Sequence, residues 1–390
     1  MRRDLGPLFG MPRHATGSLL MKTLQPEKAA EVKAMARLVP VTPLPFHYSL
    51  KDLSARTVLA WAKAYWHNRI GRKHPFQSYK KSTGVYHVNN LFRVSLAGDW
   101  GAGTDEAYEV GKQIEAFQPH CTIHLGDVYY VGDQEDTNAN FLGIADGNYD
   151  PCKWPSGSVL TLALSGNHEM YARGFSYFDS ILPALGQEAS FFCLENDNWR
   201  IIGLDTAYNS IGVPLFEHIF KPECQLTPEQ MQWLDGLEAD TPCYSLDDEK
   251  ATILLTHHQY YSAFEDNYTA CAEQLAEFIT RPVLWFWGHE HRMAIYDKYA
   301  STNGIEAYGR CIGHGGMPIE LNSPVKHKEV PLQFTDTRAY PNNEGLHVGY
   351  NGHADLYFAG SELVVKYRDL RGTVVRSETW TSNKGELKLV

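Results

Sequence analysis

Five short blocks of the sequence carry side chains that bind metal ions. Together they supply carboxylate, phenolate and amide oxygens as well as imidazole nitrogens. This mixture suits two adjacent first-row metal ions, whereas a structural zinc site would favour cysteine and histidine. In chain order, the blocks are Gly98–Gly101 (GDWG), Gly126–Tyr130 (GDVYY), Gly166–Glu169 (GNHE), His257–His258 and Gly288–His291 (GHEH).

Short apolar runs precede these blocks, and we interpret each run as a β-strand. Because the ends of strands gather at one edge of a sheet, loops there bring distant parts of the chain together. A glycine before the ligand lets the backbone turn sharply and approach a metal ion closely. The predicted strands are 91–97, 121–125, 159–164, 253–255 and 283–287.

Helices and further strands are predicted between and after the blocks. Thr104 could cap a helix with an apolar stripe to Phe117, and Thr227-Pro228 opens another. A third helix is expected near 270–279. Strands are expected at 191–194 and 199–204, and consecutive antiparallel strands at 355–358, 362–368 and 374–380.

The ordered series of blocks resembles the ligand pattern of the calcineurin-like metallophosphoesterases. Most members carry a D-x-H pair in the first block, but Gly101 stands at the third position here. Tyr130 stands three residues after Asp127, where the purple acid phosphatases place a tyrosinate ligand. The chain is therefore most similar to these phosphatases, especially the smaller, tartrate-resistant type. The resemblance covers about residues 90–380, and Gln259 departs from it, since proline is usual there.

The resemblance implies an α/β (α+β) fold, a four-layer αββα sandwich of two mixed β-sheets flanked by helices. We expect this domain to span residues 86–390. Residues 1–85 would form an N-terminal extension, mostly helical, with a helix from Ser49 that ends at Gly71.

The resemblance also implies a ligand set, with the Asp127 carboxylate bridging two ions. A phenolate is a hard donor that favours Fe(III), so the expected cofactors are Fe(III) plus Fe(II), Zn(II) or Mn(II). The first metal would take Asp99, Tyr130 and His291, and the second would take Asn167, His257 and His289.

The expected activity is hydrolysis of phosphate monoesters, in which a metal-activated hydroxide attacks phosphorus. His168 would bind the substrate and protonate the leaving group, with Glu169 orienting its ring. Asn167 would also contact substrate. His258 either contacts substrate or is a polar residue at a strand end. His314 lies in a glycine-rich loop after a strand, where it either belongs to the site or has no role in it. The alternatives are a phosphodiesterase or nuclease on the same fold, or a non-catalytic binding protein, which would be expected to show a broken ligand set.

Bulk composition is that of a folded globular protein: 390 residues, 43% hydrophobic and 21% charged. With a net charge of −11, no nucleic-acid partner is expected, and the substrate would be a phosphorylated small molecule or a phosphoprotein. One stretch, 56–81, holds seven basic residues and no acidic ones. With its interleaved aromatic residues, this stretch either makes weak contact with an anionic membrane surface or binds a polyanion, or its aromatic side packs against the catalytic domain while the lysines face water.

The seven cysteines form no C-x-x-C pair, which indicates reduced thiols. No secretory signal and no apolar run of about 18 residues is recognised. The expected location is therefore the cytoplasm. Purple acid phosphatases are typically secreted, and a reducing compartment would disfavour Fe(III), so Fe(II), Mn(II) or Zn(II) are alternatives.

Overall fold

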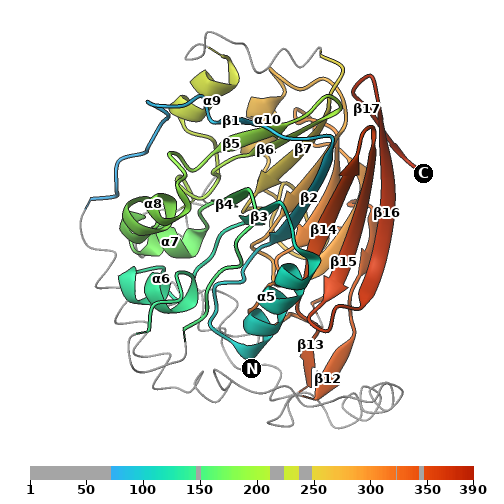
Figure 1. Cartoon of the computed structure of the whole chain (residues 1–390). Helices are drawn as coiled ribbons and strands as arrows, with labels where there is room; N and C mark the ends of the chain where they lie inside the picture. The colour runs from blue at the N-terminus through green and yellow to red at the C-terminus, as the bar shows by residue number, and fades with distance from the viewer. Residues whose placement is uncertain (1–71, 146–150, 211–223, 237–247, 322, 342–346) are drawn as a thin grey trace.

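A computed structural model describes residues 72–145, 151–210, 224–236, 248–321, 323–341 and 347–390 (Figure 1). The described residues form two large mixed β-sheets that pack face to face, with helices on both outer faces. The expected αββα sandwich is confirmed. The extension helix from Ser49 lies outside the described residues, and the division of the chain at residue 85 stays a prediction.

The first sheet has seven strands and joins two distant parts of the chain. Its strand β2 pairs in parallel with β3 on one side and antiparallel with β14 on the other. In spatial order the strands are β17 (Glu386–Leu389), β16 (Val374–Asn383), β15 (Glu362–Asp369), β14 (Gly352–Ala359), β2 (Leu91–Ala97), β3 (Cys121–His124) and β4 (Leu160–Ala163).

The second sheet has eight strands, and its centre is the parallel set β6, β7, β8 and β10. In spatial order the strands are β1 (Val85–His87), β5 (Phe192–Glu195), β6 (Trp199–Gly203), β7 (Ala251–Thr256), β8 (Val283–Trp287), β10 (Ala307–Ile312), β9 (Met293–Tyr299) and β11 (Leu332–Thr335). A small separate ribbon pairs β12 (Ala339–Pro341) with β13 (His347–Gly349).

Along the strands, successive side chains point to opposite faces of each sheet. The apolar ones form three layers, one between the two sheets and one on the outer face of each sheet, under the helices. In β2, Phe92, Val94 and Leu96 face the core between the sheets, while Ser95 points to the opposite face. The outer layers bury one side of each helix. Over the first sheet lie α5 (Asp105–Phe117), α6 (Gln134–Asn140), α7 (Asn167–Tyr171), the π-helix η2 (Tyr177–Ile181) and α8 (Leu182–Leu185), and over the second lie α9 (Pro228–Leu234) and α10 (Ala270–Leu275).

Two predicted helix starts are confirmed. The Thr104 hydroxyl accepts a hydrogen bond from Ala107 N–H at the start of α5, and the Thr227 hydroxyl accepts one from Gln230 N–H at the start of α9. Both capping threonines are buried, so each cap also anchors its helix to the sandwich.

Residues 72–81, the described part of the basic stretch, lie against the sandwich. Phe76 stacks on Phe191, with ring centroids 5.8 Å apart, whereas Lys80 and Lys81 are exposed. In this part Phe76 packs inward and Lys80 and Lys81 face solvent, whereas Lys73 is half-buried and donates to the Tyr208 carbonyl at 2.6 Å.

The six cysteines within the described residues are free thiols, and all are buried. Among the described residues, no helix has the length and apolar character needed to cross a membrane.

Candidate metal centre

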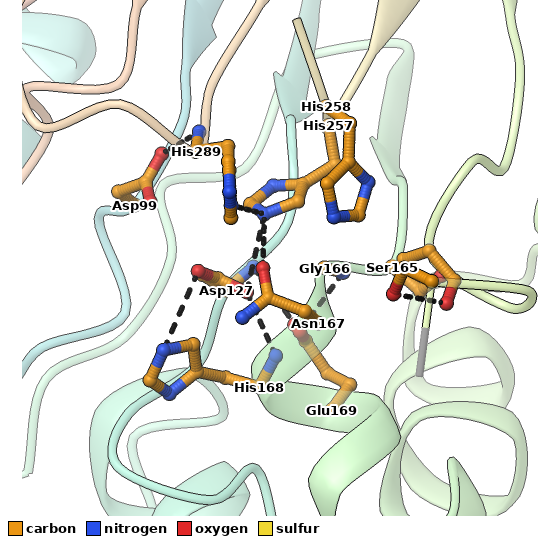
Figure 2. A network of polar contacts seen from close by, with 12 residues as sticks. Asp99, Asp127, Ser165, Gly166, Asn167, His168, Glu169, His257, His258 and His289 are labelled. Atoms are coloured by element: carbon orange, nitrogen blue, oxygen red, sulfur yellow. Dashed lines mark hydrogen bonds and ion pairs between the residues drawn. The ribbon is translucent and has the colours of Figure 1, made fainter. Parts of the chain in front are cut away.

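The sequence blocks meet where strands of the two sheets end (Figure 2). Asp99, Asp127 and Asn167 follow β2, β3 and β4 of the first sheet, while His257 and His289 follow β7 and β8 of the second. The site therefore lies across both sheets.

Two glycines allow the loops of the site to approach one another, one pair across the two sheets and one pair within the first sheet. A β-carbon added to Gly98 would lie 2.8 Å from the α-carbon of Gly288, which is closer than real β-carbons come. A β-carbon on Gly166 would lie 2.1 Å from Oδ1 of Asp127. Any side chain at these positions would push the loops apart.

Three of the predicted ligands have an unusual backbone conformation. Asp99, Asp127 and His289 have positive φ angles of 59°, 73° and 65°, in the left-handed region that side-chain-bearing residues rarely adopt. Strain of this kind gathers at functional sites, where the surrounding structure enforces it.

One group of donor atoms is formed by Asp99, Tyr129 and His291. The Tyr129 hydroxyl lies 2.7 Å from Asp99 Oδ1 and 2.8 Å from His291 Nε2, and the last two atoms are 3.3 Å apart. All three side chains are buried. The Asp99 carboxylate is held in place by the His289 backbone N–H, which donates a hydrogen bond to Asp99 Oδ2 at 2.7 Å.

A second group is formed by Asn167, His257 and His289. His257 Nε2 lies 3.0 Å from Asn167 Oδ1 and 3.3 Å from His289 Nδ1. The His257 ring is oriented from behind, since its Nδ1 lies 2.8 Å from the Leu125 carbonyl oxygen. A carbonyl only accepts, so Nδ1 carries a proton, and Nε2 is the ring nitrogen that faces the site.

Asp127 lies between the two groups, and its two oxygens face different ones. Oδ1 is 3.4 Å from His257 Nε2 in the second group, while Oδ2 is 3.1 Å from the Tyr129 hydroxyl in the first. The carboxylate is fully buried, and the His168 backbone N–H donates to its Oδ1 at 2.9 Å. Asp127 is thus the one side chain shared by both groups.

The donor chemistry of the centre calls for positive charge. The Tyr129 hydroxyl has one proton for its three close neighbours, and His257 Nε2 faces two oxygens with a lone pair. Burial disfavours the charged form of His257, but the Asp127 carboxylate outweighs burial and raises the pKa of His257 to about 9. Metal cations fit these atoms, because the sets Asp99–Asp127–His257 and His257–His258–His289 each place their ligand atoms within 4.8 Å of one another.

The same electrostatics act on the acids. Burial alone would raise the pKa of Asp127, but the imidazoles of His257 and His168 hold it well below its ordinary value. For Tyr129, burial and the Asp127 and Asp99 carboxylates together raise the pKa well above its ordinary value. The phenolate of Tyr129 therefore forms only beside a strongly charged cation.

The predicted tyrosine and the observed one differ by one position. The structure places the Tyr129 hydroxyl among the donor atoms, whereas Tyr130 is half-buried and packs its ring near that of Tyr129, with centroids 6.3 Å apart. The prediction counted positions along a loop whose side-chain directions the sequence does not specify. Tyr130 contributes its carbonyl oxygen, which lies 2.5 Å from His168 Nδ1.

His168 lies beside Asp127, with its Nε2 3.8 Å from Asp127 Oδ2. The predicted role of Glu169 is wrong. Its Oε2 accepts the backbone N–H groups of Gly166 and Asp127 at 2.9 and 3.1 Å, and the Tyr130 carbonyl orients His168 instead. A carboxylate at the third position of a helix reaches back to the helix start, which explains this geometry.

His258 lies next to the second group, with its ring centroid 4.6 Å from that of His289. Burial lowers the pKa of His258 well below its ordinary value, and neighbouring His257 lowers it further. Tyr268 packs edge-on against the His258 ring. Thr206 contacts it through a hydroxyl 3.1 Å from Nδ1.

Asp205 and Thr206 support the centre although the sequence blocks did not include them. The Asp205 carboxylate is fully buried and accepts hydrogen bonds from the Ser165 hydroxyl at 2.7 Å and from the Ala207 and Tyr208 N–H groups at 2.9 Å. It thereby ties the loop after β6 to the loop that carries Asn167. The signal was present, because Asp205 directly follows a predicted strand, as the other blocks do.

His314 is buried in the loop after β10, where its ring lies near Gly352. A β-carbon on Gly352 would lie 2.9 Å from His314 Nε2, and burial lowers the pKa of His314 to about 4. Its loop acts through the backbone: Met317 N–H donates to the Asp99 carbonyl.

A family model for calcineurin-like phosphoesterases matches residues 92–293 of this chain. No curated protein matches it in sequence. Similar solved structures include a purple acid phosphatase from yellow lupin (Lupinus luteus) seeds, with 16% identity over 78% of this chain and a TM-score of 0.48. The chain spans 55% of that phosphatase.

Two other structures are similar to a comparable degree. GAP50, the anchor in the inner membrane complex of Plasmodium, is 13% identical over 76% of this chain and 90% of its own, with a TM-score of 0.47. PhoD is 13% identical over 77% of this chain and 71% of its own, with a TM-score of 0.44.

Proposed function

Because the chain belongs to the calcineurin-like phosphoesterase family, we propose that it is a binuclear metal-dependent hydrolase of phosphate monoesters, similar to the purple acid phosphatases. The observation that carries the proposal is the position of Asp127, whose two oxygens face two separate groups of donor atoms. A two-metal centre needs one shared ligand that holds the ions about 3.5–4 Å apart, and a carboxylate can bridge in this way.

We assign the ligands from these groups. Asp127 would be shared, Asp99, Tyr129 and His291 would hold one ion, and Asn167, His257 and His289 would hold the other. Bound ions would supply Lewis-acid chemistry, which acidifies water and polarises phosphoryl oxygens. Tyr129 replaces Tyr130 in the set because its hydroxyl lies among the donor atoms.

His168 is the proposed general acid. Its Nδ1 is engaged by the Tyr130 carbonyl, so that nitrogen carries a proton and the ring is held in one orientation. The Nε2 atom, near Asp127, is then the nitrogen that exchanges a proton with the leaving group. Replacing His168 by alanine should lower turnover while the metal content stays that of the wild type, and unchanged turnover would remove this role.

The metals of the proposal are Fe(III) with Fe(II), Zn(II) or Mn(II). A phenolate is a hard donor, and the raised pKa of Tyr129 calls for a strongly charged ion to ionise it. A colourless, active and iron-free enzyme would overturn the iron assignment.

The activity is tested with p-nitrophenyl phosphate against bis(p-nitrophenyl) phosphate on metal-replete protein. We expect preference for the monoester, and loss of turnover in Asp127→Ala. Preference for the diester would establish the phosphodiesterase or nuclease alternative, and turnover of neither would favour a binding protein.

The biological substrate belongs to the same proposal: a phosphorylated small molecule or a phosphoprotein in the cytoplasm, with no nucleic-acid partner. Weak contact of residues 56–81 with an anionic membrane stays a prediction. Sedimentation of the full chain with phosphatidylserine vesicles tests it, and absence of binding removes it.

A further inference from the structure

The hydroxyl of Thr206 sits on one edge of the His258 ring. Its oxygen lies 3.2 Å from the His258 backbone nitrogen and 3.1 Å from ring atom Nδ1. Both residues are almost fully buried, with 2% of Thr206 and 4% of His258 exposed. Water therefore has little access to this contact.

The direction of the contact follows from counting protons. The His258 backbone N–H can only donate, so it occupies a lone pair of the Thr206 oxygen. The single hydroxyl proton needs an acceptor, and among the described residues the one other polar atom in contact with it is Nδ1. The hydroxyl thus donates to Nδ1, and the proton of the neutral ring lies on Nε2.

The position of Thr206 is itself fixed by its neighbours. The Asp205 carboxylate holds the turn through the N–H groups of Ala207 and Tyr208, and the side chain of Gln230 bonds to both backbone groups of Asp205 at 2.8 and 2.9 Å. The hydroxyl is therefore aimed at Nδ1 before any ligand binds.

The tautomer decides what His258 can do in this site. His257, His258 and His289 could together hold one ion, since their ligand atoms lie within 4.8 Å of one another. A nitrogen that carries a proton cannot coordinate a metal, but it can donate to a phosphoryl oxygen. A hydrogen bond from Thr206 to Nδ1 occupies one ring nitrogen and leaves the other protonated.

We propose that Thr206 is a positioning residue that sets His258 in the Nε2–H form, so that His258 binds a phosphoryl oxygen of the substrate and stays out of the metal ligand set. This inference rests on the proposed phosphatase function. It assigns to the loop after β6 a part in substrate recognition.

The test compares Thr206→Val, which keeps the shape and removes the hydroxyl, with Thr206→Ser, which keeps the hydroxyl. One neutral hydrogen bond corresponds to roughly a 3- to 10-fold change in binding. For Thr206→Val we expect a rise of that size in KM and in the inhibition constant of inorganic phosphate, with kcat within about 2-fold and metal content that of the wild type. Thr206→Ser should restore both constants.

A matched control and a double-mutant cycle separate this role from a structural one. Thr122→Val removes a buried threonine hydroxyl that donates to the Pro155 carbonyl at 2.7 Å, and it should leave KM unchanged. In a His258→Ala background, Thr206→Val should cause no further change in KM or in the inhibition constant of phosphate, because the backbone N–H of residue 258 loses the same acceptor in both backgrounds. Equal effects of Thr206→Val with and without His258, or failure of serine to restore KM, would overturn the inference.

A measurement that needs no turnover distinguishes failure of the inference from failure of the proposed function. If metal-replete wild-type protein hydrolyses neither ester, the proposed function has failed. The ¹⁵N shifts of the His258 ring, recorded on zinc-loaded protein and assigned with His258→Ala, still report the tautomer. A protonated Nε2 and an unprotonated Nδ1 support the inference, and the reverse pattern overturns it.

Discussion

Replacing each of two adjacent tyrosines by phenylalanine should have opposite outcomes. Tyr129→Phe removes an oxygen that lies 2.7, 2.8 and 3.1 Å from atoms of Asp99, His291 and Asp127. Tyr130→Phe leaves these contacts intact, because Tyr130 supports the site through its backbone carbonyl. The pair is therefore a matched comparison of one hydroxyl at neighbouring positions.

The expected size follows from these contacts. A hydrogen bond to a charged group contributes about 1.5–3 kcal/mol, and loss of that amount lowers an affinity roughly 10- to 150-fold. Since a metal–phenolate bond is stronger than a hydrogen bond, this range is a lower bound for Tyr129→Phe. For Tyr130→Phe we expect a change of less than about 3-fold.

Metal affinity can be measured by competition with a chromophoric chelator, followed by metal analysis of the dialysed protein. In iron-loaded aerobic protein, a visible tyrosinate-to-Fe(III) band should vanish in Tyr129→Phe and persist in Tyr130→Phe. The opposite result, with metal and band lost only in Tyr130→Phe, would refute the assignment of Tyr129 and restore the position given by the sequence resemblance.

Two further predictions concern stability. Removing the metals by chelation should lower the Tm by several degrees, because an ion at 1,000 times its Kd stabilises the folded state by about 4 kcal/mol. Asp127→Ala should have a low Tm that added metal does not raise. An unchanged Tm of the wild type after chelation would contradict a structural contribution of the ions. Burial lowers the pKa of His124 to about 3, so the unfolded chain, with a His pKa of about 6.5, takes up this proton first and stability falls as the pH drops below that value. Between pH 6.5 and pH 5, the free energy of unfolding measured by urea denaturation should decrease by about 2 kcal/mol less in His124→Leu than in the wild type. Parallel pH profiles of the two proteins would contradict the buried neutral state of His124.

The strands could be predicted because their signals are local, whereas the sandwich that they form was implied by the family resemblance. Strand β2 (Leu91–Ala97) and strand β8 (Val283–Trp287) have the predicted bounds. Each apolar run ended at a polar block, and that pattern alone indicated which residues meet. By contrast, α6 and α7 were not predicted, since Asn167–Tyr171 is too short to show helical periodicity.

The directions of the side chains in the loops could not be predicted from the sequence. The spacing of Tyr130 from Asp127 matched a family pattern, yet the hydroxyl of Tyr129 faces the donor atoms. The role of Glu169 toward His168 rested on analogy with carboxylates that orient a histidine, but the first turn of α7 directs its carboxylate to the Gly166 and Asp127 N–H groups. Neighbours in sequence often point to different faces, and only the fold decides between them.

The place of β14 in the first sheet has a consequence for how the protein is made. Strand β2, which leads to Asp99, has β3 as one neighbour and β14 (Gly352–Ala359) as the other, more than 250 residues later in the sequence. During synthesis, one edge of β2 therefore stays unpaired until β14 has left the ribosome, long after all the proposed ligands have been made. Pairings this distant are slow to form, and open strand edges invite aggregation in the meantime. A nascent chain could thus carry every proposed metal ligand and still depend on a late strand to complete the sheet that holds four of the seven.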